Sequence, residues 1–249
     1  MLEDLLSRDD LLAVVGDDAF ARWDPEHDLR GWTMNGAVAV MRASAARPPS
    51  LFAWGEQVGG LLDALLTTRV IAEVGTTGVS VPWPQRVEVE SRFTVTGGGD
   101  WDWMWTTDAG WTPDDVDLVT LDDKDDAEEI AALAAVENPR FEGFPGTGHS
   151  EQWLGARDER GALIACGAVQ RLPAGTAHLG GILVATSHRR RGLGRAISAA
   201  LTHRIVRGEG VCTLGMYADN DAARALYESL GYVVDKSWAS RRIAPVEPR

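Results

Sequence analysis

The sequence predicts a mixed α+β fold in two domains, a smaller one over residues 1–114 and a second one over residues 115–249. Segments with apolar residues at every second position, which is typical of strands, alternate with segments of helical apolar spacing. A length of 249 residues with 45% hydrophobic side chains is sufficient to form such cores. The composition also changes along the chain, because residues 1–114 hold eight of the ten tryptophans and only 8 of the 24 basic residues.

In the first domain, two strands are predicted over residues 31–44 and 51–56, separated by the turn-forming pair Pro48–Pro49. A single helix is predicted over residues 58–74, where leucines recur at helical spacing. These elements describe a small α+β domain without a cofactor motif.

The tryptophans of "WDWMW" alternate with other residues and predict a further strand. We interpret Trp101, Trp103 and Trp105 as core residues, with the alternative that they line a pocket between the domains. The glycine run "TGGGD", residues 96–100, is predicted to form a hairpin turn before this strand.

Gly110, Pro113 and paired aspartates predict a linker at the start of the second domain. Apolar periodicity and glycine or proline stops then predict a regular series of elements. In chain order these are a strand over 117–121, a helix over 123–138, a glycine-rich loop over 141–151, a hairpin of strands 152–158 and 162–172, a strand over 178–186, a helix over 192–208, a strand over 211–218, a helix over 220–230 and a strand over 231–243.

The segment "SHRRRGLGRAI", residues 187–197, gathers positive charge in a chain with a formal net charge of -13. Its arginines and glycines are Arg189, Arg190, Arg191, Gly192, Gly194 and Arg195. Three interpretations compete: a solvated helix end, a patch for nucleic acid, and a cradle for a phosphorylated cofactor.

The position of this cluster between a predicted strand and a predicted helix favours the cradle. The first N–H groups of a helix lack partners and attract anions, whereas cations at that end oppose the helix dipole. Gly192 and Gly194 allow the main chain to approach a pyrophosphate closely. Arginine side chains add charge-assisted hydrogen bonds to phosphate, each of about 1.5 to 3 kcal/mol.

Two segments resemble the GNAT superfamily of GCN5-related N-acetyltransferases. In "ILVATSHRRRGLGRAISAAL" the acyl-CoA signature Arg/Gln-x-x-Gly-x-Gly/Ala is matched by Arg189, Gly192 and Gly194. The segment "YADNDAARALYESLGYV" resembles the later strand–helix–strand part of the family, at Asn220, Ala223, Tyr227, Gly231 and Tyr232. The resemblance covers residues 116–243, and residues 1–115 are hypothesised to be a degenerate GNAT-like partner that shapes the acceptor pocket.

The resemblance implies a mixed, mostly antiparallel sheet flanked by helices, with a V-shaped splay between the strand ending "GILV" and the strand "CTLGMY". The pantetheine arm of acetyl-CoA is expected to bond like an extra strand to Ile182, Leu183 and Val184. The residues expected to hold the pyrophosphate are Arg189, Arg190, Arg191, Gly192, Leu193, Gly194 and Arg195.

The resemblance also assigns Tyr227 the role of protonating the departing thiolate in a direct acyl transfer, with a core tyrosine as the alternative. Asn220, Ala223 and Tyr227 are spaced to share one face of a helix, where Ala223 leaves room for the cofactor. A strand amide near Val184 is expected to stabilise the oxyanion.

The general base is not assigned by the motifs, because Gly180 and Gly181 stand where relatives often carry a glutamate. Deprotonation through water is an equal alternative, and each side-chain candidate also has a surface or loop-structuring interpretation. The candidates are His178, Glu142, Glu151 and His149.

Composition restricts the partners and the compartment. Cys166 and Cys212 lie in apolar runs and are predicted to be small core residues, so we expect neither a disulfide nor a metal site. The chain begins without signal-peptide features and lacks an apolar run of about 18 residues, which predicts a cytoplasmic protein outside the membrane. The acidic excess argues against nucleic-acid binding and favours a cationic acceptor.

The sequence therefore predicts an N-acetyltransferase that moves an acetyl group from acetyl-CoA to a primary amine of a small-molecule or peptide acceptor. The main alternative is a non-catalytic acyl-CoA-binding regulatory module that kept the cradle and lost the base.

Overall fold

The computed structural model describes residues 1–44, 47–110 and 116–246, which divide into two compact units. The N-terminal unit comprises Met1–Trp103, Met216–Asn220 and Val234–Arg249, and the C-terminal unit comprises Met104–Gly215 and Asp221–Val233. This division differs from the predicted boundary after residue 114, and Pro113 of the predicted linker lies outside the described residues. Each unit is thus completed by segments that are distant in sequence.

The N-terminal unit contains a sheet with the strand order β1-β2-β3-β4-β5-β12-β6. Its elements are β1 (Glu3–Ser7), α1 (Arg8–Val15), α2 (Ala19–Trp23), β2 (Asp28–Met34), β3 (Ala37–Ser44), β4 (Arg47–Trp54), α3 (Val58–Thr67), α4 (Val70–Glu73), β5 (Gly78–Pro82), the 3-10 turn η1 (Trp83–Gln85), α5 (Arg86–Glu90), β6 (Val95–Thr106) and β12 (Val233–Ile243).

The prediction of a single strand over residues 31–44 is wrong, because these residues lie in a hairpin formed by β2 and β3. Asn35 and Gly36 have φ angles of 51° and 77° and form the two-residue turn between Met34 and Ala37. An Asn-Gly pair with two positive φ angles is typical of tight hairpins whose twist matches the flanking strands. The continuous apolar pattern had concealed this turn.

Two further local predictions are wrong in the same unit. The helix predicted over residues 58–74 is interrupted at Arg69, which has a φ of 64° and separates α3 from α4. The glycine run of residues 96–100 lies inside β6 and is not a hairpin turn. A Cβ at Gly98 would overlap the Ser240 carbonyl of β12, so glycine permits a close approach of two strands there.

Aromatic rings build much of the N-terminal core. Phe20 of α2 lies with its ring centroid 4.9 Å from Trp238 and 5.5 Å from Trp103, both fully buried. The core interpretation is therefore confirmed for Trp103. Trp101 is partly buried and donates its indole N–H to the Ser240 hydroxyl at 2.8 Å.

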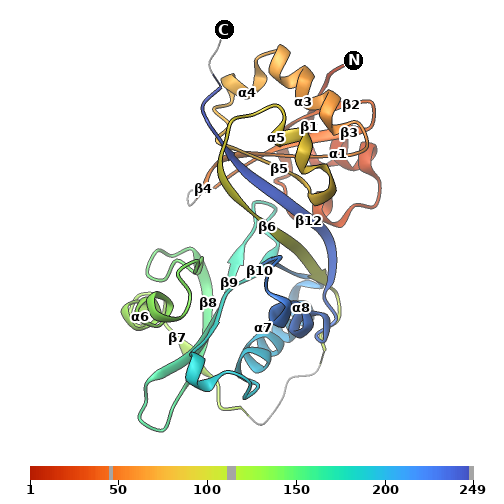
Figure 1. The fold of residues 1–249 in the computed structure, drawn as a ribbon. Helices are drawn as coiled ribbons and strands as arrows, with labels where there is room; N and C mark the ends of the chain where they lie inside the picture. Colours follow the sequence, from red (N-terminus) through yellow and green to blue (C-terminus); the bar gives the residue numbers. More distant parts are fainter. Residues whose placement is uncertain (45–46, 111–115, 247–249) are drawn as a thin grey trace. The chain divides into compact units, whose positions relative to one another are not determined.

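The C-terminal unit contains strands in the order β11-β10-β9-β8-β7. Its elements are β7 (Val119–Leu121), α6 (Ala127–Glu137), β8 (Ser150–Arg157), β9 (Leu163–Arg171), β10 (Ala177–Val184), the 3-10 turn η2 (Thr186–His188), α7 (Leu193–Glu209), β11 (Cys212–Tyr217) and α8 (Asp221–Glu228). Figure 1 shows α6 on one face of this sheet and α7 with α8 on the other.

The core of this unit follows the predicted strand and helix faces. Ile130 of α6, Trp153 of β8 and Leu183 of β10 belong to one cluster of buried residues. Cys166 and Cys212 are buried free thiols, as predicted, and burial raises the pKa of each to about 12. They stay protonated at neutral pH and act as small apolar residues.

The two units share an order of elements. In each, three antiparallel strands are followed by a helix and then by a strand parallel to the third: β2-β3-β4, α3 and β5 in one, and β8-β9-β10, α7 and β11 in the other. A right-handed crossover through a helix is the usual way to join two parallel strands. Within the described residues, no helix is both long and apolar enough to span a membrane.

Candidate functional site

The turn between β10 and α7 exposes helix N–H groups without a side-chain cap. Arg190 and Gly192 both have left-handed backbone angles, with φ values of 62° and 83°. The first helical bond runs from the Ala196 amide to the Gly192 carbonyl at 2.9 Å, and no side chain caps the helix at Gly192. The preceding three amides therefore have no partner inside the helix, which makes this end receptive to an anion.

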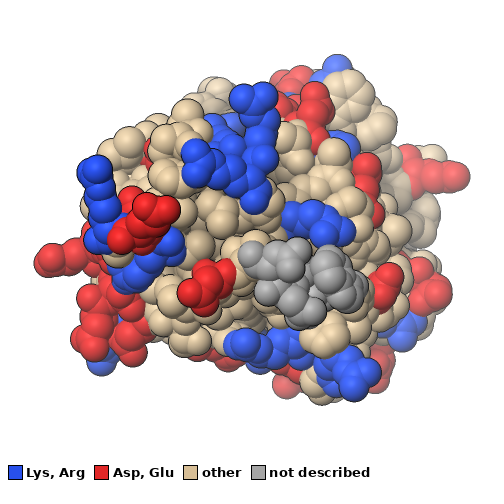
Figure 2. Space-filling view, turned by 90° about the horizontal axis from the view of Figure 1, so that it is seen from below, with Lys and Arg blue, Asp and Glu red and all other residues tan. Residues whose placement is uncertain are grey.

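Positive side chains surround this helix end. Arg190, Arg191 and Arg195 are exposed, and none of them has an ion-pair partner within the described part of the chain. The first turn of α7 contains no acidic residue that would balance the helix dipole. Figure 2 shows several groups of lysine and arginine side chains on the face seen from below Figure 1.

Arg189 differs from these three arginines because its side chain folds back onto the protein. Its Nε donates to the Val184 carbonyl at 3.1 Å, and its Nη2 lies 3.2 Å from the Glu137 carboxylate. Arg189 therefore braces the turn against the end of β10.

Glu137 connects this turn to α6. It accepts a hydrogen bond from the Thr186 hydroxyl at 2.6 Å as well as the bond from Arg189. The hydrogen bonds from Thr186, followed by the Arg189 charge, lower the pKa of Glu137 below its usual value. The carboxylate is thus ionised where it holds the turn.

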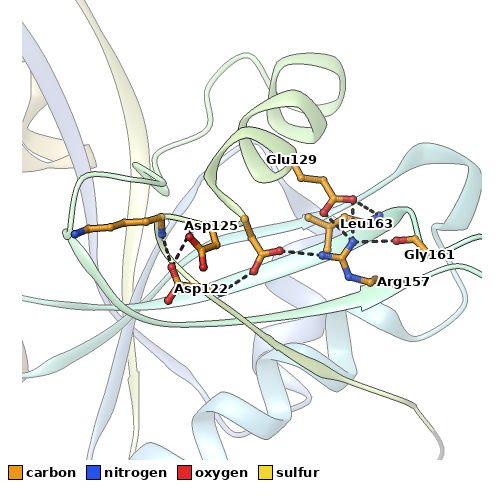
Figure 3. Close-up of polar contacts among 8 residues, drawn as sticks. Asp122, Asp125, Glu129, Arg157, Gly161 and Leu163 are labelled. Atoms are coloured by element: carbon orange, nitrogen blue, oxygen red, sulfur yellow. Dashed lines mark hydrogen bonds and ion pairs between the residues drawn. The ribbon is translucent and has the colours of Figure 1, made fainter.

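The first turn of α6 is held in place by a separate ion-pair network. Arg157 of β8 binds Asp126 at 3.0 Å and Glu129 at 2.7 Å, and Glu129 also accepts from the Leu163 amide at 3.0 Å (Figure 3). These contacts attach α6 to the β8–β9 hairpin and so hold in place the helix that carries Glu137.

A β-bulge lies in the middle of β10. The register with β9 shifts between Gly180 and Leu183, and Gly181 has a φ of 61°. One extra residue with a left-handed glycine is the pattern of a G1 bulge, which bends a strand and increases its twist. The bulge explains why glycine stands here, since a Cβ at Gly181 would lie 3.2 Å from Phe141.

β10 separates from β11 at this bulge. The two parallel strands pair only at His178 with Thr213 and at Leu179 with Leu214, whereas β10 continues to Val184. The edge of β10 beyond Leu179 therefore has no β11 partner. This is the splay that the sequence resemblance implied.

Main-chain alternation shows which groups face the splay. The Ala185 amide donates to the Ile164 carbonyl at 2.8 Å, on the β9 side. Because successive residues of a strand direct their N–H and C=O groups to opposite edges, Val184 faces the splay edge and Leu183 faces β9. Leu183 is also a buried core residue.

Tyr227 lies on α8 and is almost completely buried, with 7% of its surface exposed. Burial raises the pKa of its phenol well above the usual value, and the nearby Ser198 hydroxyl offsets part of that rise. The phenol therefore keeps its proton at neutral pH. Ala223 is on the same helix, whereas Asn220 lies one residue before the helix begins, in the segment grouped with the N-terminal unit.

The four candidates for a base have different surroundings. Glu151 is half exposed and bound to Arg171 at 2.8 Å, and the ring of His149 packs edge-on against Phe144 at 5.3 Å. The Glu142 carbonyl accepts from Gln170 at 3.1 Å. His178 is half-buried at the last but one paired position before the splay, and its Nδ1 lies 2.9 Å from the Thr213 hydroxyl.

Residues 153–243 match the family described as FR47-like protein. No curated protein is similar enough in sequence to count as a relative of this chain. The matched residues include the arginine-rich turn, the splayed edge of β10 and Tyr227.

Solved structures of the GNAT family resemble the whole chain. A protein assigned to the GNAT family of acetyltransferases from Novosphingobium aromaticivorans is 21% identical, with 95% of this chain and 97% of that chain covered and a TM-score of 0.56. A GCN5-related N-acetyltransferase from Kribbella flavida is 15% identical, with 90% of this chain and 91% of that chain covered and a TM-score of 0.55. A tandem GNAT protein from the clavulanic acid biosynthesis pathway is 16% identical, covers 100% of both chains, and has a TM-score of 0.54.

These likenesses establish the fold. The α+β fold predicted from the sequence and the resemblance to the GNAT superfamily are confirmed.

Proposed function

Because the chain has the GNAT fold and its residues 153–243 match a GNAT-related family, we propose that this protein is an N-acetyltransferase that uses acetyl-CoA. Its acceptor is a primary amine of a small molecule or peptide. The observation that carries the proposal is the uncapped start of α7, with exposed arginines around it and the splayed edge of β10 beside it.

The cradle would hold the pyrophosphate of coenzyme A. The amides of Leu193, Gly194 and Arg195 supply donors at the positive end of the helix dipole. Arg190 and Arg191 supply side-chain charge, and each charge-assisted bond to phosphate contributes about 1.5 to 3 kcal/mol. Arg189 supports the turn through Val184 and Glu137.

The splayed edge of β10 would bind the pantetheine arm as an added strand. We assign this role to Ile182 and Val184, because Leu183 between them directs its main chain to β9. The Val184 amide would also stabilise negative charge at the reacting carbonyl.

Acetyl-CoA supplies an acetyl group activated as a thioester. The protein would orient this group along β10, exclude water from it and provide a proton at the buried Tyr227 hydroxyl for the departing sulfur. Asn220 and Ala223 are proposed to bind the same arm.

A calorimetric titration with coenzyme A tests the cradle directly. We expect saturable binding and a higher melting temperature, since a ligand at 100 times its Kd stabilises a protein by about 2.7 kcal/mol. The double variant R190A/R191A should weaken binding at least about tenfold. A matched control, R204A/R207A, changes two exposed arginines far from the turn and should bind normally. Absence of binding to the unmodified protein would refute the proposal.

One observation favours a second candidate function, a non-catalytic acyl-CoA-binding module. The glycines at positions 180 and 181 leave no carboxylate at the bulge of β10. The two functions differ in turnover. The enzyme releases thiol from acetyl-CoA in the presence of an amine, whereas the module binds acetyl-CoA and leaves its thioester intact. A panel of a polyamine, an aminoglycoside, an arylalkylamine and a lysine peptide separates them.

A further inference from the structure

His178 occupies the apex of the splay. It pairs with Thr213 at the last but one position where β10 and β11 remain together, and the bulge at Gly181 follows. If the pyrophosphate lies at the start of α7, the arm extends from Val184 back toward this apex. The four steps from Val184 to Gly180 cover about 13 Å at the rise of a strand. The far end of the arm, which carries the reacting group, then lies nearest His178.

The hydrogen bonds around Thr213 define the tautomer of His178. The Thr213 hydroxyl donates its single proton to the Ala177 carbonyl at 2.9 Å, and it is fully buried. It must therefore accept the bond from His178 Nδ1, 2.9 Å away. In the neutral form of the ring, Nδ1 therefore carries the proton and the lone pair is on Nε2. A histidine held in this way is the form that a general base requires.

His178 and Tyr227 lie on opposite faces of the sheet. Gly167 faces α7, because a Cβ there would overlap Ile197, and Gln170, three residues along β9, therefore faces the other side. His178 is the direct partner of Gln170 and shares that side. Tyr227 is buried next to Ser198 of α7.

We propose that His178 is the general base of the transfer and that Thr213 positions it. This rests on the proposed N-acetyltransferase function. The acceptor nitrogen gives a proton to His178 Nε2 as it bonds to the acetyl carbon, the carbon–sulfur bond breaks, and Tyr227 supplies a proton to the sulfur. The base thus approaches from one face of the sheet and the acid from the other.

The first test needs no acceptor. Nitrogen-15 NMR of the histidine rings, with H178N used to assign the signals of residue 178, should show the Nδ1–H tautomer and a shift on addition of acetyl-CoA. T213V should lose the tautomer preference. If acetyl-CoA shifts the amides of α7 but His178 is the Nε2–H tautomer or does not respond, the base is misassigned. If no signal responds, the proposed function itself fails.

The second test uses two nucleophiles that differ in their need for a base. Alkylamines are protonated at neutral pH, whereas hydroxylamine is largely neutral there. H178N keeps a side-chain donor toward Thr213 and should lower kcat with an alkylamine at least about 100-fold. Its kcat with hydroxylamine should fall only by a few-fold. Imidazole should restore part of the rate of H178A. Equal losses with both nucleophiles would indicate a structural role. H203N, which changes a histidine bonded to the Ala109 carbonyl, is the matched control.

Discussion

The carboxylate of Glu137, in the last turn of α6, accepts a hydrogen bond from Arg189, which is 52 residues away and three residues before the uncapped start of α7 at Gly192. The same carboxylate binds the Thr186 hydroxyl at 2.6 Å. A helix on one face of the sheet therefore holds the turn that leads to a helix on the other face. The shape of the proposed cradle would therefore depend on a residue outside the arginine-rich motif.

Replacement of Glu137 by glutamine should weaken coenzyme A binding without removing it. The turn loses a charged contact, and we expect at most about a fivefold increase in Kd because the Arg189 side of the ion pair is half exposed to solvent. Calorimetry measures this effect, and E151Q, which removes a carboxylate bound to Arg171, is the control. Equal affinities of E137Q and the unmodified protein would show that the brace is unimportant.

The Glu137 brace should also depend on pH. Its pKa is lowered in the folded protein from a usual value of 4.5, so its contribution to stability is complete above that value and is lost as the pH falls through the lower folded pKa. The melting temperatures of E137Q and the unmodified protein should differ at pH 7 and converge in acid. A difference that persists at the lowest pH would point to packing instead of charge.

Tyr227→Phe should lower kcat by about 100-fold or more, because general acid catalysis commonly contributes that much, while coenzyme A affinity remains unchanged. Tyr232→Phe is the matched control. Its hydroxyl bonds to Thr202 at 2.8 Å and Cys212 at 3.1 Å in the core, so the variant should lose about 1 to 3 kcal/mol of stability and keep its turnover. Unchanged turnover in Tyr227→Phe would mean that the Tyr227 hydroxyl has a structural role and is not the acid.

Gly181→Ala should destabilise the protein by about 1 to 3 kcal/mol, the usual cost of a residue forced into an unfavourable backbone region. Its φ is 61°, and a Cβ would lie 3.2 Å from Gly143 and Phe141. Gly208→Ala, in α7, meets nothing within 4 Å and should instead stabilise the helix by about 0.8 to 1 kcal/mol. Chemical denaturation measures both, and a neutral Gly181→Ala would mean that the bulge is not required.

One coenzyme A should bind per chain, although the two units share their order of elements. In the N-terminal unit the corresponding helix, α3, has no arginine in its first turn, and the Glu88 carboxylate lies so close to Gly59 that a Cβ there would overlap it. A negative group at this end disfavours a phosphate. Calorimetry should give a stoichiometry near one, and Gly192→Val should abolish the heat entirely; half the heat remaining would reveal a second site.

The sequence alone determined those features whose physical cause is local. The arginine-rich turn and the helix that follows it depend on residues adjacent in the chain, so their pattern predicted the cradle and, with the segment around Tyr227, the family. The Asn35–Gly36 turn was also local and carried a recognisable signal, but the apolar residues on both sides of it concealed the hairpin.

Tertiary structure decided the features that depend on distant partners. The glycine run of residues 96–100 has the composition of a turn, yet it is a strand because β12 approaches it closely at Ser240. The tautomer of His178 depends on Thr213, 35 residues away, and the brace on Arg189 depends on Glu137. Hydrogen bonds and close backbone approaches of this kind form only when strands and helices pack, because each joins two segments that are far apart in the sequence.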